Sequence, residues 1–341
     1  CALPILLTVF FISNLSPIAH KIKLVDQPNN RKNHQGNIPL IGGISIALSF
    51  TISILTLNMS LSDFRALLAA FLLMIIVGLL DDFNEISPRS RILAQIIAAL
   101  FMTCWGNILL THLGHLFSFH ADFSLGNWAF PVTILLIIAL INAVNMLDGL
   151  DGLAGASTLI SLLSLFIVAY YSHAYAEMQL IAILAACIVS FLYFNFPLGN
   201  LKSRLIFLGD AGSTSLGLML AWFGIQLSQL PNTLLQPGYL PWFFLLPIFD
   251  LTTVTLRRIF IKHTSPFIAD REHIHHMLEK MRVSTRVITY LLTAIAALSN
   301  LLALIMIYFQ IPALFSLIGF IILFFTYFYY ASNFWHNKKL V

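Results

Sequence analysis

Residues 65–91 read "RALLAAFLLMIIVGLLDDFNEISPRSR", an apolar run that ends abruptly in two adjacent carboxylates, Asp81 and Asp82. Apart from Arg65 at its start, the run over 65–80 carries no charge, and it predicts a helix that crosses a lipid bilayer. The polar residues after it predict a loop at the membrane surface. Long apolar runs and short polar links alternate in this way along the whole chain.

Composition places the chain among membrane proteins. Of its 341 residues 59% are apolar and 9% are charged, whereas soluble domains carry about 25% charged residues. The predicted fold is all-α and polytopic, a single domain over residues 1–341 with about eleven membrane-spanning helices. These are expected near 2–18, 38–58, 65–80, 91–110, 128–147, 155–172, 177–194, 212–228, 240–258, 287–307 and 311–333.

Charge predicts the orientation. All but Arg65 of the 18 Lys and Arg lie in or beside the loops near 19–37, 81–91, 148–154, 195–211 and 259–286, or in the C-terminal tail. Because cytoplasmic loops carry the excess of Lys and Arg, these loops are predicted to be cytoplasmic, with the N-terminus outside and the C-terminus inside. All but Asp63, Asp122 and Glu177 of the 14 acidic residues share that side, which predicts a catalytic face there.

Two function classes are not favoured by these counts. The net charge of +4 is explained by membrane orientation, so no nucleic-acid partner is predicted. Cys1, Cys104 and Cys187 lie far apart without CxxC spacing, and we interpret them as small apolar residues rather than zinc ligands or disulfides. Since the chain begins with Cys, we expect further residues before it in the intact protein.

Asp81 and Asp82 place two like charges side by side at the end of a span. Such a pair raises at least one pKa unless a cation compensates, and acidic groups at a helix C-terminus oppose the helix dipole. The pair is therefore a candidate Mg²⁺ contact or a base acting on an acidic nucleophile. The alternative is a solvated helix end.

A polar stripe follows the fifth predicted span, in "INAVNMLDGLDGLAG" at 141–155. Asn142, Asn145, Asp148 and Asp151 recur every three residues, so they line one helix face as it leaves the membrane. Polar groups at membrane depth are expensive and usually face a cavity or a partner. A purely structural stripe is the alternative, and a calcium loop is not predicted because the remaining ligands are missing.

The stretch "FLGDAGS" at 207–213 places Asp210 between glycines just before a span. Free N–H groups at a helix start suit phosphate, and a neighbouring carboxylate can hold the accompanying Mg²⁺. Equally, Asp210 or Ser213 could simply cap the helix. Farther along, Asp250 lies inside an apolar run seven residues before Arg257, and we expect a structural ion pair between the two.

The stretch "DREHIHHMLEK" at 270–280 is the most polar of the chain. Asp270, His273 and His276 have the spacing of one helix face, and His275 would point elsewhere. Structural zinc usually uses cysteines or wider spacing, so an anion site is favoured, in which Arg271 and the histidines donate to phosphate oxygens. The alternative is a solvated, His-rich loop.

Together these loops offer carboxylates for Mg²⁺ and donors for phosphate on one membrane face. Phosphoryl transfer needs both, because a metal neutralises the pyrophosphate and donors orient it. A site at the bilayer surface also indicates that one substrate is a lipid.

Five motifs in this order resemble those of the polyprenyl-phosphate N-acetylhexosamine-1-phosphate transferases, glycosyltransferase family 4. They are "LVDQPNNRKNHQGNIPLIGG", "LLDD", "NAVNMLDGLDGL", "FLGDAGS" and "DREHIHH", and the resemblance covers almost the whole chain. The His-x-His-His form of the last motif is similar to the branch that uses UDP-GlcNAc. The branch that transfers phospho-MurNAc-pentapeptide typically has three adjacent histidines.

The resemblance implies attack by undecaprenyl phosphate on the β-phosphorus of UDP-GlcNAc, giving GlcNAc-pyrophosphoryl-undecaprenol and UMP. It also implies Mg²⁺ as cofactor, with Mn²⁺ as a candidate substitute, and a multi-pass protein of the bacterial inner membrane. The product would begin a lipid-linked surface glycan of the O-antigen or enterobacterial common antigen type. A homodimer is a further expectation from the resemblance.

The resemblance also assigns roles to residues. It places Mg²⁺ at Asp210, with Asp81 and Asp82 as further candidates. The residues expected to be catalytic are Asp81, Asp82, Asp148 and Asp151. Those expected to bind the nucleotide sugar or its pyrophosphate are Asn142, Asn145, Arg271, His273, His275 and His276. Candidate contacts to the lipid phosphate or nucleotide are Lys21, Arg31, Lys32 and His34, whose alternative role is membrane orientation.

Two other functions remain open at this point. One is the same chemistry with another UDP-N-acetylhexosamine, because the orientation of one hydroxyl is not readable from these motifs. The other is a transporter or flippase of a phosphorylated lipid or nucleotide sugar. A transporter would need ionisable groups deep in several helices or interrupted helices in matching halves, and here Asp250 is the main deep charge.

Overall fold

A computed structural model of the chain describes residues 2–26, 36–115, 122–197, 206–231, 233–265 and 271–337. Its helices are α1 (Ala2–Ile22), α2 (Gly42–Leu55), α3 (Arg65–Phe83), α4 (Pro88–Leu100), α5 (Ala129–Leu147), α6 (Leu153–Tyr171), α7 (Tyr175–Asn195), α8 (Gly209–Ser228), α9 (Leu240–Phe243), α10 (Leu245–Leu256), α11 (Ile274–Lys280), α12 (Thr285–Tyr308) and α13 (Ala313–Asn337). Strands β1 (Val25–Asp26) and β2 (Ile38–Pro39) pair antiparallel. Short 3₁₀ turns precede α3, α5 and α9, and π-helical turns extend α4 to Trp105 and α10 to Ile261.

Each of the eleven predicted spans overlaps a helix, so the mostly helical, polytopic prediction is confirmed. Among the described residues seven helices are long and apolar enough to cross a membrane, or eight if one bent pair is a single span. Two details of the prediction are wrong. The span expected at 38–58 begins with β2, and its helix α2 has only 14 residues. The span expected at 240–258 is broken at Phe244. The exact number of spans and their orientation stay predictions.

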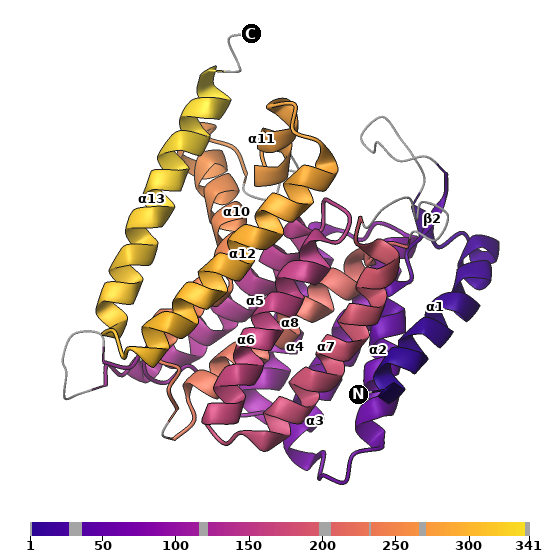
Figure 1. The fold of residues 1–341 in the computed structure, drawn as a ribbon, viewed down its shortest axis with the longest axis horizontal. Helices are drawn as coiled ribbons and strands as arrows, with labels where there is room; N and C mark the ends of the chain where they lie inside the picture. Colours follow the sequence, from indigo (N-terminus) through magenta and orange to yellow (C-terminus); the bar gives the residue numbers. More distant parts are fainter. Residues whose placement is uncertain are drawn as a thin grey trace.

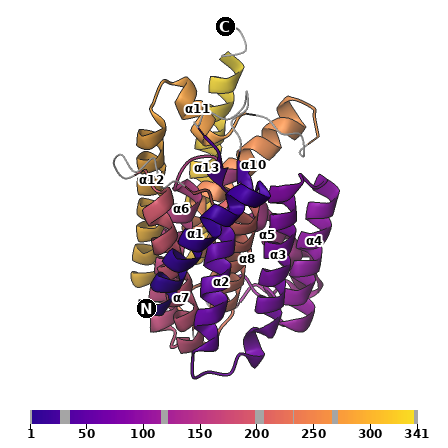
Figure 2. The same cartoon turned by 90° about the vertical axis from the view of Figure 1, so that its right-hand side faces the viewer.

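Helix α8 is the centre of the bundle. All but Asp210 and Gln226 of its 20 residues are buried, and it packs against α2, α3, α5 and α6. It lies in the middle of the helices in both views (Figures 1 and 2). Asp210, in the first turn of α8, is therefore one of the two residues of this central helix that are not fully buried.

Glycines let the neighbouring helices approach the start of α8. A Cβ on Gly78 of α3 would lie 2.3 Å from the Cα of Ala211, and a Cβ on Gly43 of α2 would lie 2.2 Å from the backbone nitrogen of Gly212. Both neighbours are backbone atoms, which cannot rotate away. The closeness of α2 and α3 to α8 is thus fixed by two missing side chains, and it sets the position of Asp210.

The break between α9 and α10 turns the chain by 86°. Such a break frees backbone carbonyls, which must find donors inside a membrane protein. The carbonyl of Phe243 accepts from Ser161 Oγ at 2.7 Å and from Asn300 Nδ2 at 3.1 Å, and that of Trp242 accepts from Ser299 Oγ at 2.5 Å. Side chains of α6 and α12 therefore hold the bend, which directs α10 toward α11.

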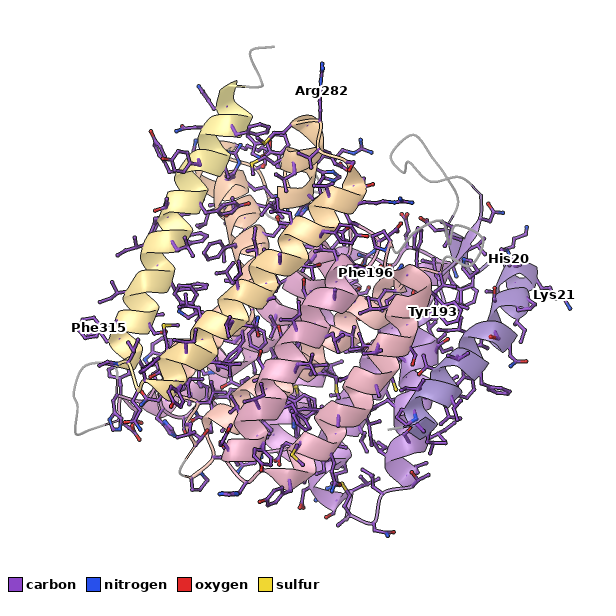
Figure 3. All side chains as sticks on the ribbon, viewed as in Figure 1. His20, Lys21, Tyr193, Phe196, Arg282 and Phe315 are labelled. Atoms are coloured by element: carbon purple, nitrogen blue, oxygen red, sulfur yellow. The ribbon has the colours of Figure 1, made fainter. Side chains whose placement is uncertain are left out.

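Large apolar side chains are exposed on the outer helices, as expected for a surface in contact with lipid tails. Phe315 of α13 is 59% exposed and Tyr193 of α7 is 52% exposed (Figure 3). The basic residues Lys21 and Arg282 lie toward the end of the bundle where α11 and β2 are found, hereafter the α11 end (Figures 1 and 3). That this end faces the cytoplasm stays a prediction from the loop charges.

Replacing Gly78 by alanine tests the contact between α3 and α8. The added Cβ would overlap the backbone of Ala211, so we expect the free energy of unfolding to fall by about 1–3 kcal/mol, as for other overpacked cores. Thermal unfolding in detergent measures this. Gly319→Ala is the matched control, because its Cβ would meet only the Trp242 ring at 3.6 Å. Equal melting temperatures for the two variants would contradict the close approach.

Candidate active site

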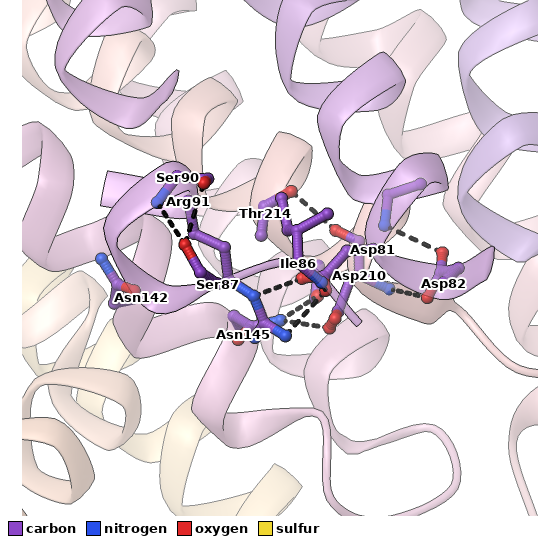
Figure 4. A network of polar contacts seen from close by, with 12 residues as sticks. Asp81, Asp82, Ile86, Ser87, Ser90, Arg91, Asn142, Asn145, Asp210 and Thr214 are labelled. Carbon is purple, nitrogen blue, oxygen red and sulfur yellow. Dashed lines mark hydrogen bonds and ion pairs between the residues drawn. The ribbon is translucent and has the colours of Figure 1, made fainter. Parts of the chain in front are cut away.

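The N-terminus of α8 is capped by a side chain from another helix. Leu208, the residue before α8, provides no capping side chain. Instead the Asp82 carboxylate accepts from the backbone N–H of Asp210 at 2.8 Å and from that of Ala211 at 3.2 Å (Figure 4). An acceptor at this position satisfies N–H groups that the helix itself leaves unpaired. Asp82 thereby ties the end of α3 to the backbone of Asp210 and Ala211.

Asp81 faces the other way and has different partners. It is 6% exposed and accepts from the Ile86 N–H at 2.9 Å and from Arg91 Nη2 at 2.7 Å. Its carboxyl group also lies within hydrogen-bonding reach of the Asp210 carboxyl group, and the two point toward one another in Figure 4. Adjacent residues of the sequence pair are thus separated: Asp82 holds the α8 backbone, and Asp81 meets the Asp210 side chain.

The stripe on α5 contributes amides to the same region. Asn145 Nδ2 donates to Asp210 Oδ1 at 2.7 Å and to Ser213 Oγ at 2.9 Å, which fixes the Asp210 carboxylate from a third helix. Asn142 exchanges hydrogen bonds with Gln95 of α4, the shorter being 2.7 Å from Asn142 Nδ2 to Gln95 Oε1. The predicted stripe therefore does face polar partners inside the bundle.

A small cavity opens beside these groups. It measures about 40 Å³, which is enough for two or three water molecules or for part of a ligand. Residues from α3, α4, α5 and α8 surround it, and they are Met74, Val77, Gly78, Asp81, Arg91, Gln95, Asn142, Asn145 and Thr214. The cavity thus brings carboxylate, guanidinium and amide groups together at the end of the central helix.

The loop between α5 and α6 carries the other two predicted aspartates. Asp148 and Asp151 are both half-buried. Burial raises the pKa of Asp148 well above its ordinary value, and the nearby carboxylates of Asp210, Asp82 and Asp151 raise it further. The loop is held in place by Asn195 of α7, which accepts from the Gly152 N–H at 2.7 Å and donates to the Ile206 carbonyl at 2.7 Å.

The histidines lie on and just before α11, against this loop. His275 is 3% exposed, and a Cβ on Gly149 would lie 2.5 Å from its ring, so the ring rests on the α5–α6 loop. His273 and His275 stack with ring centres 5.7 Å apart, and His276 lies 4.1 Å from His275. His276 Nδ1 is 2.9 Å from Glu279 Oε2.

Two expectations for this region are wrong. His273 is not on the helix face shared with His276, because α11 begins at Ile274 and His273 is its cap residue in extended conformation. Asp250 and Arg257 have separate partners: Asp250 Oδ2 lies 2.8 Å from His273 Nδ1, and Arg257 Nε lies 3.2 Å from Glu272 Oε2. Asp250 of α10 and Arg257 of its extension therefore both contact the segment just before α11.

The first loop is only partly placed. Lys21 lies exposed in the last turn of α1, away from the contacts described above (Figure 3). Arg31, Lys32, His34 and Asp270 lie outside the described residues. The end of this loop joins the site through its backbone: the Phe207 N–H donates to the Pro39 carbonyl, and the N–H groups of Gly42 and Gly43 donate to Phe207 and Leu208. Arg271 is exposed beside α11.

The donors around Asp210 suit a divalent cation. No group of three or more His, Cys, Asp and Glu in the part of the chain described here has the geometry of a complete metal site. Mg²⁺, however, is usually held by one or two carboxylates and completed by substrate phosphates and water. The facing carboxyl groups of Asp81 and Asp210 repel each other when both are ionised, and a cation between them would remove that repulsion. The residues therefore fit Mg²⁺.

Three residues of the site were missed from sequence: Arg91, Gln95 and Asn195. Gln95 and Asn195 are polar residues within or at the end of apolar runs, a signal that could have found them. Arg91 was counted only as a loop charge, and nothing in its spacing from Asp81 indicates a contact.

Comparison with known proteins gives consistent matches. The model of the family described as "Glycosyl transferase family 4" matches residues 64–228. Proteins named undecaprenyl-phosphate alpha-N-acetylglucosaminyl 1-phosphate transferase match nearly the whole chain. The one from Yersinia pestis is 34% identical, with 88% of this chain and 81% of the relative covered. Those from Escherichia coli K12 and Pasteurella multocida Pm70 are 31% and 34% identical, with 98% of this chain and 91% and 92% of the relatives covered.

Stability should depend on pH through His275. Burial lowers its pKa from 6.5 to about 3, with the nearby His276 and His273 adding to the effect. Between these values the unfolded chain binds a proton that the folded chain does not, so this residue makes stability fall as pH falls from 6.5 toward 3, by at most about 1.4 kcal/mol per pH unit.

Melting temperatures of the wild type and His275→Asn across this pH range measure the effect, since asparagine does not titrate. We expect a shallower decline on acidification in the variant. Parallel declines would show that His275 is not held neutral by the fold.

Proposed function

The chain belongs to glycosyl transferase family 4, and we propose that it transfers GlcNAc-1-phosphate from UDP-GlcNAc to undecaprenyl phosphate with release of UMP. The names of its relatives support this reaction. The proposed setting is the cytoplasmic face of a bacterial inner membrane, at the first membrane step of an O-antigen or enterobacterial common antigen type of glycan.

The observation that carries the proposal is that all five motifs meet at one end of α8. The segment after β2 binds the backbone at 207–208, Asp82 caps α8, and Asn145 holds Asp210. His275 lies on Gly149 of the loop that bears Asp148 and Asp151. Carboxylates, amides and imidazoles from segments nearly 200 residues apart in the sequence are thereby brought to one end of α8, as a transfer between two phosphorylated substrates requires.

We assign the Mg²⁺ site to Asp210 and Asp81, with Mn²⁺ as a candidate substitute. When bound, the metal would neutralise charge on the pyrophosphate of the nucleotide sugar. Asn145 keeps the Asp210 carboxylate oriented, and Asp82 holds the backbone from which it projects. Asp82 therefore acts in this proposal by supporting its neighbours rather than by meeting substrate.

The nucleotide sugar is assigned to the side of the site formed by the α5–α6 loop and α11. His276 and the exposed Arg271 would donate to phosphate or sugar oxygens, and such donors stabilise the charge that develops during transfer. His273, whose Nδ1 faces Asp250, would accept from a hydroxyl or N–H group of the sugar through Nε2. The raised pKa of Asp148 suits a carboxyl group that keeps its proton, and can donate a hydrogen bond, at a higher pH than an ordinary aspartate. Asp151 completes this side in the proposal, whereas Asn142 lines the cavity beside Arg91.

The lipid phosphate is assigned to the cavity beside Arg91. A guanidinium suits a phosphate because its N–H groups form parallel hydrogen bonds to two oxygens. The phosphate is already largely ionised at neutral pH, so the site needs to position its attacking oxygen rather than to deprotonate it. Gln95 and Asn142, whose amide groups are hydrogen-bonded to each other, also line this cavity and carry no charge.

Two other functions are weighed against this one. Another UDP-N-acetylhexosamine would use the same groups, and the difference would lie in contacts to one sugar hydroxyl. A transporter is less well supported, because all but Asp63, Arg65, Asp122 and Glu177 of the charged residues that the structure describes lie with the loops predicted to be cytoplasmic. The deep charge of Asp250 is tied to the start of α11 rather than left in a central pathway. A homodimer remains an expectation from the family.

The first experiment is UMP release by purified protein in detergent with UDP-GlcNAc, undecaprenyl phosphate and Mg²⁺. We expect release that requires the lipid and that falls at least about 100-fold in Asp210→Asn and with EDTA. The substitution removes a carboxylate assigned to the metal, and EDTA removes the metal that would neutralise the pyrophosphate. Thr326→Val on α13, whose hydroxyl bonds only within its own helix, is the control and should retain activity.

Turnover with UDP-GalNAc but not with UDP-GlcNAc would support the same transfer reaction with a different sugar substrate. Folded protein that releases UMP from none of the UDP-N-acetylhexosamines would refute the transferase.

A further inference from the structure

Asp250 is a carboxylate buried within the apolar helix α10, only 1% exposed. A charge at such a depth is costly, and it persists where partners compensate for lost water. It was expected to form an ion pair along its own helix. Its partners instead lie 23 and 24 residues away, at the start of α11.

Both carboxylate oxygens of Asp250 are used at this helix start. Oδ1 accepts from the backbone N–H of Ile274, the first residue of α11, at 2.8 Å, and Oδ2 lies 2.8 Å from Nδ1 of His273. His273 provides no side-chain cap to its own helix. Asp250 thus performs for α11 the task that a capping residue usually performs from within the same segment.

A second ionic contact fixes the same segment to the extension of α10. Glu272 Oε2 lies 3.2 Å from Arg257 Nε and 2.9 Å from Lys262 Nζ. At the other end of α11, Lys280 Nζ lies 4.2 Å from the centre of the Trp335 ring of α13. Consecutive residues 272, 273 and 274 are therefore each attached to α10 or its extension, and the short helix cannot slide without breaking them.

The contact to His273 also fixes which ring nitrogen carries a proton. An ionised carboxylate only accepts hydrogen bonds, so Nδ1 of His273 must be the donor. In the neutral ring Nε2 is then an acceptor, available to a hydroxyl or N–H group of the substrate. The ring cannot turn over without losing its hydrogen bond to Asp250. Histidines that bind metals are oriented by the same type of buried acceptor.

We propose that Asp250 is a positioning residue of the transferase, which docks α11 and holds His273 with its proton on Nδ1 and Nε2 directed to the nucleotide sugar. The proposal rests on the proposed function only for the identity of that ligand. The docking of α11 is independent of it.

The isosteric variant Asp250→Asn separates the two contacts. Its amide oxygen can still accept from the Ile274 N–H, but its NH₂ group would donate to His273 Nδ1 and move the ring proton to Nε2. Asp250→Leu removes both contacts. Thr252→Val is the matched control on α10, because the Thr252 hydroxyl bonds only to carbonyls within its own helix.

The first measurement is the affinity for UDP-GlcNAc by calorimetry in a double-mutant cycle. We expect Asp250→Asn to weaken binding about 10-fold or more in the wild-type background. In the His273→Ala background the same substitution should weaken binding less than about 3-fold, because the aspartate acts through the histidine. Thr252→Val should bind as the wild type does. The positioning of His273 would be overturned if the double variant lost affinity by the product of the two single losses, or if Asp250→Asn bound UDP-GlcNAc with wild-type affinity.

The second measurement needs no ligand. Hydrogen exchange of the segment 271–281 should accelerate at least about 10-fold in Asp250→Leu and stay near the wild-type rate in Asp250→Asn. Unchanged exchange in the leucine variant would overturn the docking of α11. If the wild type releases no UMP and binds no UDP-GlcNAc, the proposed function fails, while this exchange result still decides whether Asp250 docks the helix.

Discussion

The backbone N–H groups at the start of α8 are the constraint on which the site depends. A helix leaves its first N–H groups without partners, and here the helix is buried on nearly every side with no capping residue of its own. Glycines at 43 and 78 admit the neighbouring backbones closely. The partner comes from α3 as the carboxylate of Asp82, and this contact holds the backbone from which the Asp210 side chain projects.

The same arrangement occurs again at α11, where Asp250 caps a helix to which it does not belong. In both places a carboxylate from one helix accepts a hydrogen bond from the first backbone N–H groups of another. The residues proposed to meet the metal or the substrate lie beside these contacts: Asp210 in one case, His273 in the other. Charge in this chain is scarce, and much of it is used to join elements. The adjacent Asp81 and Asp82 illustrate the division, because successive positions on α3 point in different directions and reach different neighbours.

The apolar runs made the mostly helical, polytopic fold predictable from sequence. The motifs named residues that the structure brings together at the start of α8, such as Asp82, Asn145 and Asp210, and their roles stay predictions. Periodicity correctly indicated that Asn142 and Asn145 face polar partners. It could not show that the Asp82 carboxylate accepts hydrogen bonds from the backbone at the start of α8, because the contact with Asp210 joins residues 128 positions apart. The pairing of Asp250 with Arg257 failed for a related reason: spacing along one helix shows which residues share a face, and the bend at Phe244 decides what that face meets. Arg91 and Asn195 depend on tertiary contacts in the same way.

The burial of α8 has a consequence for how the chain enters the membrane. Although it has 20 residues, α8 is not among the helices of the described chain that are apolar enough to cross a bilayer on composition alone, and its Ser213, Thr214 and Ser215 are buried against protein. A segment of this kind gains little from lipid and is stabilised by other helices. The four helices against which it packs most extensively, α2, α3, α5 and α6, all precede it in the chain, whereas Leu240 and Phe244, which meet it at Gly224, follow it. We therefore expect α2, α3, α5 and α6 to be in the membrane before α8 is synthesised. Helix α8 would then pack against helices that are already inserted, and the order of the helices in the sequence would also be their order of assembly.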